Sequence, residues 1–189
     1  DRDTSGVMVV AKNDAAHMNL AAQFEHRTVE KDYFALVSPG PDRQRDWIEQ
    51  PIGVHPYQRE KMAVRPNHPK AKTAKTFYEI TERYQRFAFA KISPKTGRTH
   101  QIRVHFQHIG CPILADKLYS GQHQFCCDTL LKSPSASSDS TVAPVLSRQA
   151  LHAQRLQVKH PRTGKILEVK AKIPEDIKNV MDFIRANAS

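Results

Sequence analysis

Residues 95–109 hold the densest group of side chains in this chain that could do chemistry, including the arginines Arg98 and Arg103. The planar guanidinium of arginine suits carboxylate and phosphate partners. Because Arg98 directly follows Gly97 in an expected turn, we predict that it is buried and paired with an acidic residue elsewhere in the chain. The two arginines need not point the same way, so one can face a pocket while the other serves structure.

A helix is expected to carry this segment. Ile102, Phe106 and Ile109 recur at the spacing of one helix face, which would anchor the segment in a core. Acidic groups suited to Arg98 occur in Asp1–Gly6, just before a strand-like run. An ordinary capped turn, with Thr4 and Ser5 bonding local backbone, would leave the same pattern.

Two other chemistries fit the segment poorly. His100 and His105 do not share one helix face, and no acidic ligand accompanies them, so we expect no metal. Lys95–Thr99 lacks the second glycine and the Gly-Lys-Ser/Thr core of a phosphate loop, so ATP use is not expected. We expect no cofactor.

The length and charge of the chain suggest one domain that binds a polyanion. Its 189 residues suit a single core, and 29 Lys and Arg against 19 Asp and Glu give a net charge of +10. Such an excess favours RNA or DNA, although an anionic membrane surface would attract it similarly. No apolar run approaches the about 20 residues of a membrane span, and residues 1–5 are no signal peptide. The cysteines, an odd count, are expected to be free thiols, and the protein a cytoplasmic monomer.

Hydrophobic patterning predicts an α+β fold with a mixed, mainly antiparallel sheet flanked by helices. The predicted strands are 6–12, 31–37, 76–81, 86–93, 149–153, 156–158 and 166–169, and helices are expected from Asn13 to about His26 and after Pro174. The chain is expected to begin inside a domain.

Two stretches differ in character from this core. Residues 42–75 alternate prolines with cations and are expected to form an exposed basic arm, with 52–54 and 61–64 paired as a hairpin and Arg59 and Lys61 contacting RNA. A solvated loop with scattered charge is the plainer alternative. Residues 120–147, rich in Ser, Thr and Pro, are expected to be a surface insertion.

Four segments in this order resemble the RluA-like pseudouridine synthases. The family's first motif, His-Arg-Leu-Asp-x-x-Thr-Ser-Gly, is matched from its Asp onward by Asp1–Gly6. Lys31, Tyr33 and Ala35 match Lys-x-Tyr-x-Ala, and 97–105 match Gly-Arg-Thr-His-Gln-Ile-Arg-Val-His without a gap. The arm hairpin and residues 151–161 also resemble family elements, so the likeness spans nearly the whole chain.

This resemblance implies an RNA uridine isomerase that needs no cofactor. Asp1 would be the nucleophile, Arg98 its partner, and Tyr33 the residue that stacks on the base. Ile102, Arg103 and Leu114 are expected on the substrate side, although Ile102 and Leu114 could equally be ordinary core. The family's His-Arg-Leu and the strands before it are not in this sequence, and Ala115-Asp116 stands where Gly-Asp is common.

Two functions remain open at this point. The first is isomerisation of specific uridines in structured RNA, either ribosomal or transfer RNA. The second is a catalytically silent RNA-binding module of the same fold.

Overall fold

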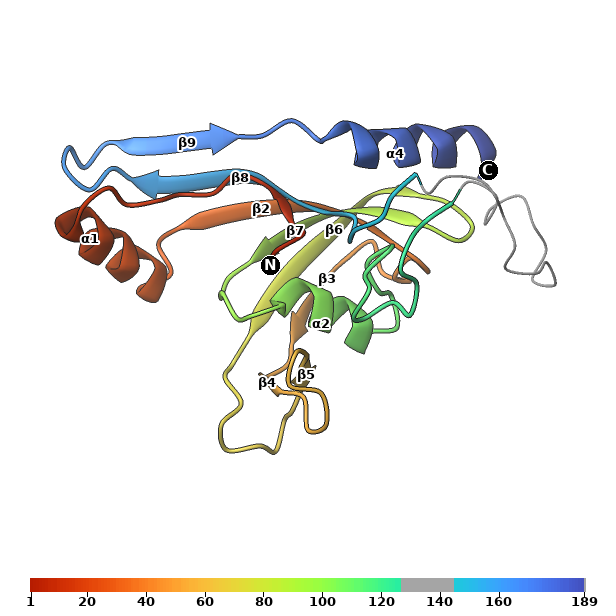
Figure 1. Cartoon of the computed structure of the whole chain (residues 1–189), viewed down its shortest axis with the longest axis horizontal. Coiled ribbons are helices and arrows are strands. Elements are labelled where there is room, and N and C mark those ends of the chain that lie inside the picture. The colour runs from red at the N-terminus through yellow and green to blue at the C-terminus, as the bar shows by residue number, and fades with distance from the viewer. Residues whose placement is uncertain (127–144, 189) are drawn as a thin grey trace.

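The computed structural model describes residues 1–126 and 145–188 (Figure 1). In that part of the chain seven strands form one sheet, in the order β1-β8-β2-β7-β6-β3 with β9 paired to β8. Only β1 and β8 pair in parallel. The sheet is therefore mixed and mainly antiparallel, which confirms the predicted fold class. The strands are β1 (Ser5–Gly6), β2 (Glu30–Val37), β3 (Arg45–Glu49), β6 (Lys75–Arg83), β7 (Ala88–Pro94), β8 (Leu151–Lys159) and β9 (Ile166–Lys170).

The helices begin and end close to where their patterns predict. In α1 (Asp14–Glu25) the Asn13 side chain caps the first turn, accepting the Ala16 N–H at 2.9 Å. The segment rich in chemistry contains α2 (Gln101–His108), and α4 (Glu175–Asn187) follows Pro174 and buries a 3.6-period apolar stripe. No helix in the described ranges combines the length and apolarity that a membrane span requires.

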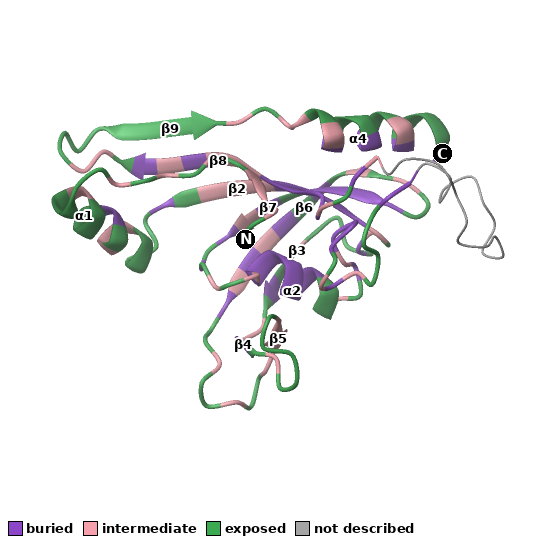
Figure 2. Ribbon diagram, viewed as in Figure 1, coloured by how far each residue is buried: buried purple, intermediate pink, exposed green. Residues whose placement is uncertain are grey.

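The core lies where the central strands meet α2 and α4. Leu36, Phe89 and Ile92 from the middle of the sheet pack with Phe106 of α2 and Ile184 of α4. Figure 2 shows this burial concentrated in the middle of the sheet and in α2, whereas β9 is exposed along its length. Because α2 packs its apolar face into this core, the polar residues beside it are held in fixed positions.

The predicted hairpin forms, but it is shorter than the predicted arm. β4 (Ile52–Val54) pairs with β5 (Met62–Val64) and projects away from the main sheet below α2 (Figure 1). The expected arm also contained β3, which instead pairs with β6 inside the main sheet. Ile52 is buried with Val104 of α2, so the hairpin is anchored beside the helix.

Two expectations need correction. Within the predicted strand 6–12, Gly6 belongs to β1 and Val7–Lys12 is not assigned to a strand, although the Val7 N–H still bonds to the Ala153 carbonyl of β8 at 2.9 Å. The middle of the predicted insertion, 127–144, lies outside the described residues. At the two ends of the insertion residues 121–124 and Ser147 are exposed, but Phe125 and Leu146 are each 1% exposed and form an isolated bridge in the core.

Two of the cysteines can be placed. Cys111 and Cys126 are free thiols, as predicted, and both are buried.

Candidate active site

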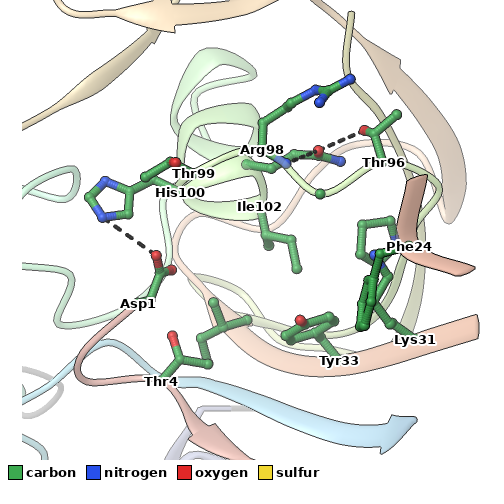
Figure 3. Close-up of a pocket in the computed structure, with 14 residues that line it drawn as sticks. Asp1, Thr4, Phe24, Lys31, Tyr33, Thr96, Arg98, Thr99, His100 and Ile102 are labelled. Atoms are coloured by element: carbon green, nitrogen blue, oxygen red, sulfur yellow. Dashed lines mark hydrogen bonds and ion pairs between the residues drawn. The ribbon is translucent and has the colours of Figure 1, made fainter. Parts of the chain in front are cut away.

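A cleft of about 440 Å³ lies between the N-terminal turn, α1, β2 and the start of α2. Asp1, Tyr33, Arg98 and Ile102 all line it, although they come from distant parts of the sequence (Figure 3). Its volume is within the usual range of about 300–1,000 Å³ for small-molecule pockets. The cleft therefore brings together four of the eight residues that the sequence singled out.

The N-terminal turn is anchored by residues far along the chain. Its Thr4 N–H lies 3.4 Å from the Asp1 carbonyl oxygen, which closes a tight turn. Arg148 donates to the Asp3 carbonyl at 3.2 Å, and Gln149 donates to the Thr4 hydroxyl at 3.3 Å. Thr4 thus bonds across the fold rather than only locally, and the Asp1 side chain is held in the cleft at 18% exposure.

The groups nearest to the Asp1 carboxylate are His100 and Arg103, not Arg98. His100 Nε2 lies 3.4 Å from Asp1 Oδ1, and an Arg103 terminal nitrogen lies 3.8 Å from Asp1 Oδ2. Arg98 is only half-buried and donates its Nε–H to the Thr73 carbonyl at 3.1 Å. The prediction that a buried Arg98 pairs with Asp1 is therefore wrong. The turn at Gly97 directs Arg98 to the rim, because the helix that enters the core begins only at Gln101.

Arg103 is the buried arginine with an acidic partner. It holds Asp116 through two hydrogen bonds of 2.7 Å, from Nε and from a terminal nitrogen. Asp116 is 0% exposed and also accepts the N–H groups of Leu118 and Tyr119. Ala115 is left-handed at φ 56°, which explains why glycine would suit this position. A charge pair that is buried and fully hydrogen-bonded fixes the guanidinium facing Asp1.

His100 connects Asp1 to the hairpin. Burial, followed by the nearby Arg103 charge, lowers the pKa of His100 to about 4, so the ring is neutral at pH 7. Its Nδ1 lies 2.8 Å from the Tyr119 hydroxyl, which accepts the Met62 N–H of β5 at 2.9 Å. If that hydroxyl donates to Nδ1, the ring proton sits on Nε2 and faces the Asp1 carboxylate, the only tautomer that avoids opposing two acceptors.

Other polar residues of the same segment lock α2 to β6. Gln101 accepts from the Thr96 hydroxyl at 2.6 Å and donates to the Thr76 hydroxyl at 2.9 Å. His105 contacts that Thr76 hydroxyl at 2.8 Å and the Gln50 carbonyl at 3.0 Å. These bonds satisfy the buried polar groups on both sides, so Gln101 and His105 serve structure. In the described ranges, His, Cys, Asp and Glu form no group of three or more that could hold a metal.

The apolar wall of the cleft differs in part from the expectation. Ile102 lines the cleft, but the other aliphatic wall residue is Leu151 of β8 rather than Leu114. Leu114 is 2% exposed and belongs to the core, where its backbone bonds to Leu36 and Ala150. Tyr33 lines the cleft beside them, and burial raises the pKa of its phenol, which is therefore protonated at neutral pH.

The remaining candidates lie away from the cleft. Arg59 and Lys61 lie in the loop of the hairpin and at the start of β5, and neither lines the cleft. Sequence reasoning missed the acceptor Asp116 and the bridging Tyr119. The signal available for Asp116 was its place shortly after Pro112, beyond the end of the predicted helix, since a carboxylate in a turn can accept the following N–H groups.

Comparison with known proteins gives a consistent picture. The sequence model described as RNA pseudouridylate synthase matches residues 1–108. The chain is 38% identical over 189 residues to the ribosomal large subunit pseudouridine synthase D of Haemophilus ducreyi, covering 99% of this chain and 54% of that protein. It is 36% identical to the uncharacterized RNA pseudouridine synthase YlyB of Bacillus subtilis, covering 99% of this chain and 54% of that protein. The chain thus spans about half the length of the curated relatives it matches.

Solved structures agree with the fold. The human RNA pseudouridylate synthase domain containing 4 superposes with a TM-score of 0.73 at 25% identity, covering 94% of this chain and 70% of that one. The human domain containing 1 gives a TM-score of 0.69 at 24% identity, covering 100% and 79% of the two chains.

Proposed function

Because this chain belongs to the RNA pseudouridylate synthase family, we propose that it carries the catalytic centre of an enzyme that isomerises uridines in large-subunit ribosomal RNA. One observation carries the proposal. The Asp1 carboxylate lies in a cleft that also presents the ring of Tyr33, with Arg103 at 3.8 Å. The RNA class comes from the names of the relatives, and we place the reaction in the cytoplasm.

The reaction asks for one carboxylate and no redox chemistry. The bond between N1 of uracil and C1′ of the ribose breaks, the base turns, and C5 bonds to C1′. The proton on C5 leaves and N1 gains one, so the product is an isomer and no electrons are exchanged. In our proposal Asp1 attacks the ribose as nucleophile and is released when C5 bonds to C1′.

Arg103 and His100 keep Asp1 ready for this step. The positive Arg103 attracts the Asp1 carboxylate across 3.8 Å, and its two hydrogen bonds to Asp116 keep the guanidinium in place. The neutral His100 ring can point an N–H at the other carboxylate oxygen without neutralising it. Both residues are positioning groups for Asp1.

Tyr33, Ile102 and Leu151 offer a flat and an apolar surface for an extruded uracil. A base must leave its stack before a protein side chain can reach its C1′. The raised pKa of Tyr33 means that its hydroxyl can take the C5 proton only by passing its own proton to another acceptor. The Asp1 carboxylate, which lines the same cleft, is the acceptor that we propose.

The hairpin supplies the RNA contacts in this proposal. Arg59 is exposed and Lys61 half-buried on an element that projects from the sheet, which suits contact with phosphates (Figure 1).

Release of tritium tests the function. We expect the protein to release tritium from a large-subunit ribosomal RNA transcript made with uridine tritiated at C5, because forming the new bond expels that hydrogen. The Asp1→Asn variant should release none while binding the same RNA. Transfer RNA transcripts serve as the matched substrate, and release from them alone would overturn the ribosomal assignment. No release from either RNA would overturn the enzyme proposal in favour of a silent binding module.

A further inference from the structure

A second hollow of about 240 Å³ adjoins the cleft. Five residues line both spaces, so the two are continuous along one wall: Phe24, Lys31, Thr96, Gly97 and Arg98. Gly97 leaves room at this wall, since a Cβ there would lie 3.6 Å from the Lys31 ammonium. A chain of nucleotides that leaves the cleft could therefore follow this shared wall into the second hollow.

The second hollow is strongly cationic. Arg27, Lys31, Lys95 and Arg98 line it, against the single carboxylate of Glu25. Within residues 1–126 and 145–188 none of these four cations forms an ion pair. The cations of the hollow are therefore available to an anionic ligand.

An exposed aromatic ring stands between the two spaces. Phe24 of α1 is 40% exposed, so its ring can be reached from the solvent, and Lys31 Nζ lies 5.6 Å from its ring centroid. In Figure 3 Phe24 and Lys31 lie at the end of the cleft opposite Asp1, and Tyr33 lies between Asp1 and this pair. Aromatic faces next to cationic grooves are the usual means of holding single-stranded nucleic acid.

The backbone at Arg27 supports a role for its side chain. The end of α1 forms a Schellman motif, in which Arg27 N–H bonds to Phe24 O at 3.2 Å and Thr28 N–H bonds to Gln23 O at 3.1 Å. Arg27 takes the left-handed position of this motif at φ 58°, where glycine is favoured. Arg27 therefore holds a strained backbone position while its side chain lines the hollow. This combination supports a contact between the Arg27 side chain and a ligand in the hollow.

We propose that the second hollow is a subsite for the nucleotide next to the target uridine in the RNA strand. Its base stacks on Phe24, and its phosphates contact Arg27, Lys95 and Arg98. This inference rests on the proposed function, since the neighbouring nucleotide presupposes a uridine in the cleft. The subsite reads the strand through its backbone and the face of a base, so it adds affinity without demanding one sequence.

The test compares two arginine variants by RNA affinity at several salt concentrations. Arg27→Gly should unfold at a temperature equal to or above that of the parent, because glycine relieves the strain, and yet bind RNA more weakly. Losing one phosphate contact should reduce the slope of log affinity against log salt by about 1. Arg86→Ala removes an exposed arginine that lines neither the cleft nor the second hollow, and should leave affinity and slope unchanged.

Phe24→Leu tests the stacking part separately. We expect binding to fall by about 5- to 100-fold with the salt slope unchanged, because a base loses its aromatic platform but no charge is removed. If Arg27→Gly and Arg86→Ala behave alike and Phe24→Leu binds as the parent does, the subsite is overturned.

The outcomes separate this inference from the proposed function. Unchanged binding in the Arg27 and Phe24 variants, with tritium released by the parent, would overturn the subsite alone. Weakened binding in both variants, with no tritium release by the parent, would support the subsite and overturn the reaction. A parent protein that does not bind RNA would overturn both.

Discussion

Arg103 grips Asp116 with two hydrogen bonds of 2.7 Å and thereby holds its third nitrogen 3.8 Å from the Asp1 carboxylate. Both partners of the grip are nearly inaccessible, with side-chain exposures of 6% and 0%. The nitrogen facing Asp1 therefore cannot swing away without breaking a buried charge pair. The positive charge nearest to Asp1 therefore belongs to Arg103 of α2 and not to Arg98 in the turn before this helix.

The first prediction concerns the two arginines. Arg103→Lys should lower single-turnover pseudouridine formation by about 100-fold or more, since lysine keeps the charge but cannot hold Asp116 and face Asp1 at once. Arg98→Lys is the matched control and should retain most turnover, because Arg98 donates to the Thr73 carbonyl rather than facing Asp1, and lysine keeps the charge for the proposed phosphate contact. A greater loss of turnover in Arg98→Lys than in Arg103→Lys would refute this assignment.

The second prediction concerns Tyr33. Tyr33→Phe keeps the ring and should bind RNA normally while losing turnover, whereas Tyr33→Leu should lose both. Binding is measured by filter retention and turnover by tritium release in a single cycle. Full turnover in the Phe variant would exclude a proton-transfer role for the hydroxyl.

The sequence located the site but did not identify the arginine that faces Asp1. The motif from Gly97 to His105 predicted a helix and a nearby carboxylate, and both are present. Which arginine enters the core depends on where the helix begins, and that is set by the left-handed His100 at φ 55°. The spacing of hydrophobic residues carries no information about the φ angle of a single residue, so it could not predict this start of the helix.

Long-range hydrogen bonds were also beyond the sequence. The sequence alone does not show whether Gln101 and His105 bind substrate or stabilise the fold, because a polar side chain in a motif does not reveal its hydrogen-bond partner. Their partners Thr76, Lys75 and Gln50 lie in another part of the chain. Similarly, the sequence left open whether Leu114 lines the pocket or belongs to the core, and its burial in the core depends on packing between distant segments.

The third prediction tests this buried network. Gln101→Leu should lower the free energy of unfolding by about 2–4 kcal/mol, since it leaves the Thr96 hydroxyl and the Arg98 backbone N–H without their acceptor. The exposed Gln107 of the same helix provides the control, and Gln107→Leu should change stability by less than about 0.5 kcal/mol. Urea titrations of both variants measure the difference, and equal effects would show that the network contributes little.

The fourth prediction concerns acid. Burial lowers the pKa of His100, His105 and His152 below the ordinary value near 6.5. In the unfolded chain these rings take up protons first, so stability should be full above about pH 6.5 and fall as the pH decreases through the lowered pKa values, that of His100 being about 4. Thermal unfolding across this window measures the fall.

A histidine variant separates this effect from other losses of stability in acid. His105→Gln should be less stable at neutral pH but should lose less stability on acidification than the parent. Exposed His17 is the control, and His17→Gln should keep the parent's pH dependence. A parent protein whose stability does not change over this window would contradict the prediction.

The last prediction concerns the hairpin, whose cations should contact RNA phosphates. Arg59 and Lys61 lie between the projecting β4 and β5, and Lys70 lies in the loop that follows β5. Replacing all three with alanine should weaken RNA binding. Each lost phosphate contact should reduce the slope of log affinity against log salt by about 1, so a reduction of about 3 is the upper limit. The matched control replaces Lys165, Lys172 and Lys178, which flank β9 or lie on α4, with alanine. It removes the same charge, so net charge alone would affect both variants equally.

Because Met62 of β5 donates to Tyr119, which contacts His100, the hairpin variant's unfolding temperature should be checked against the parent's. An unchanged salt slope in a hairpin variant that folds as the parent does would show that RNA does not contact this hairpin.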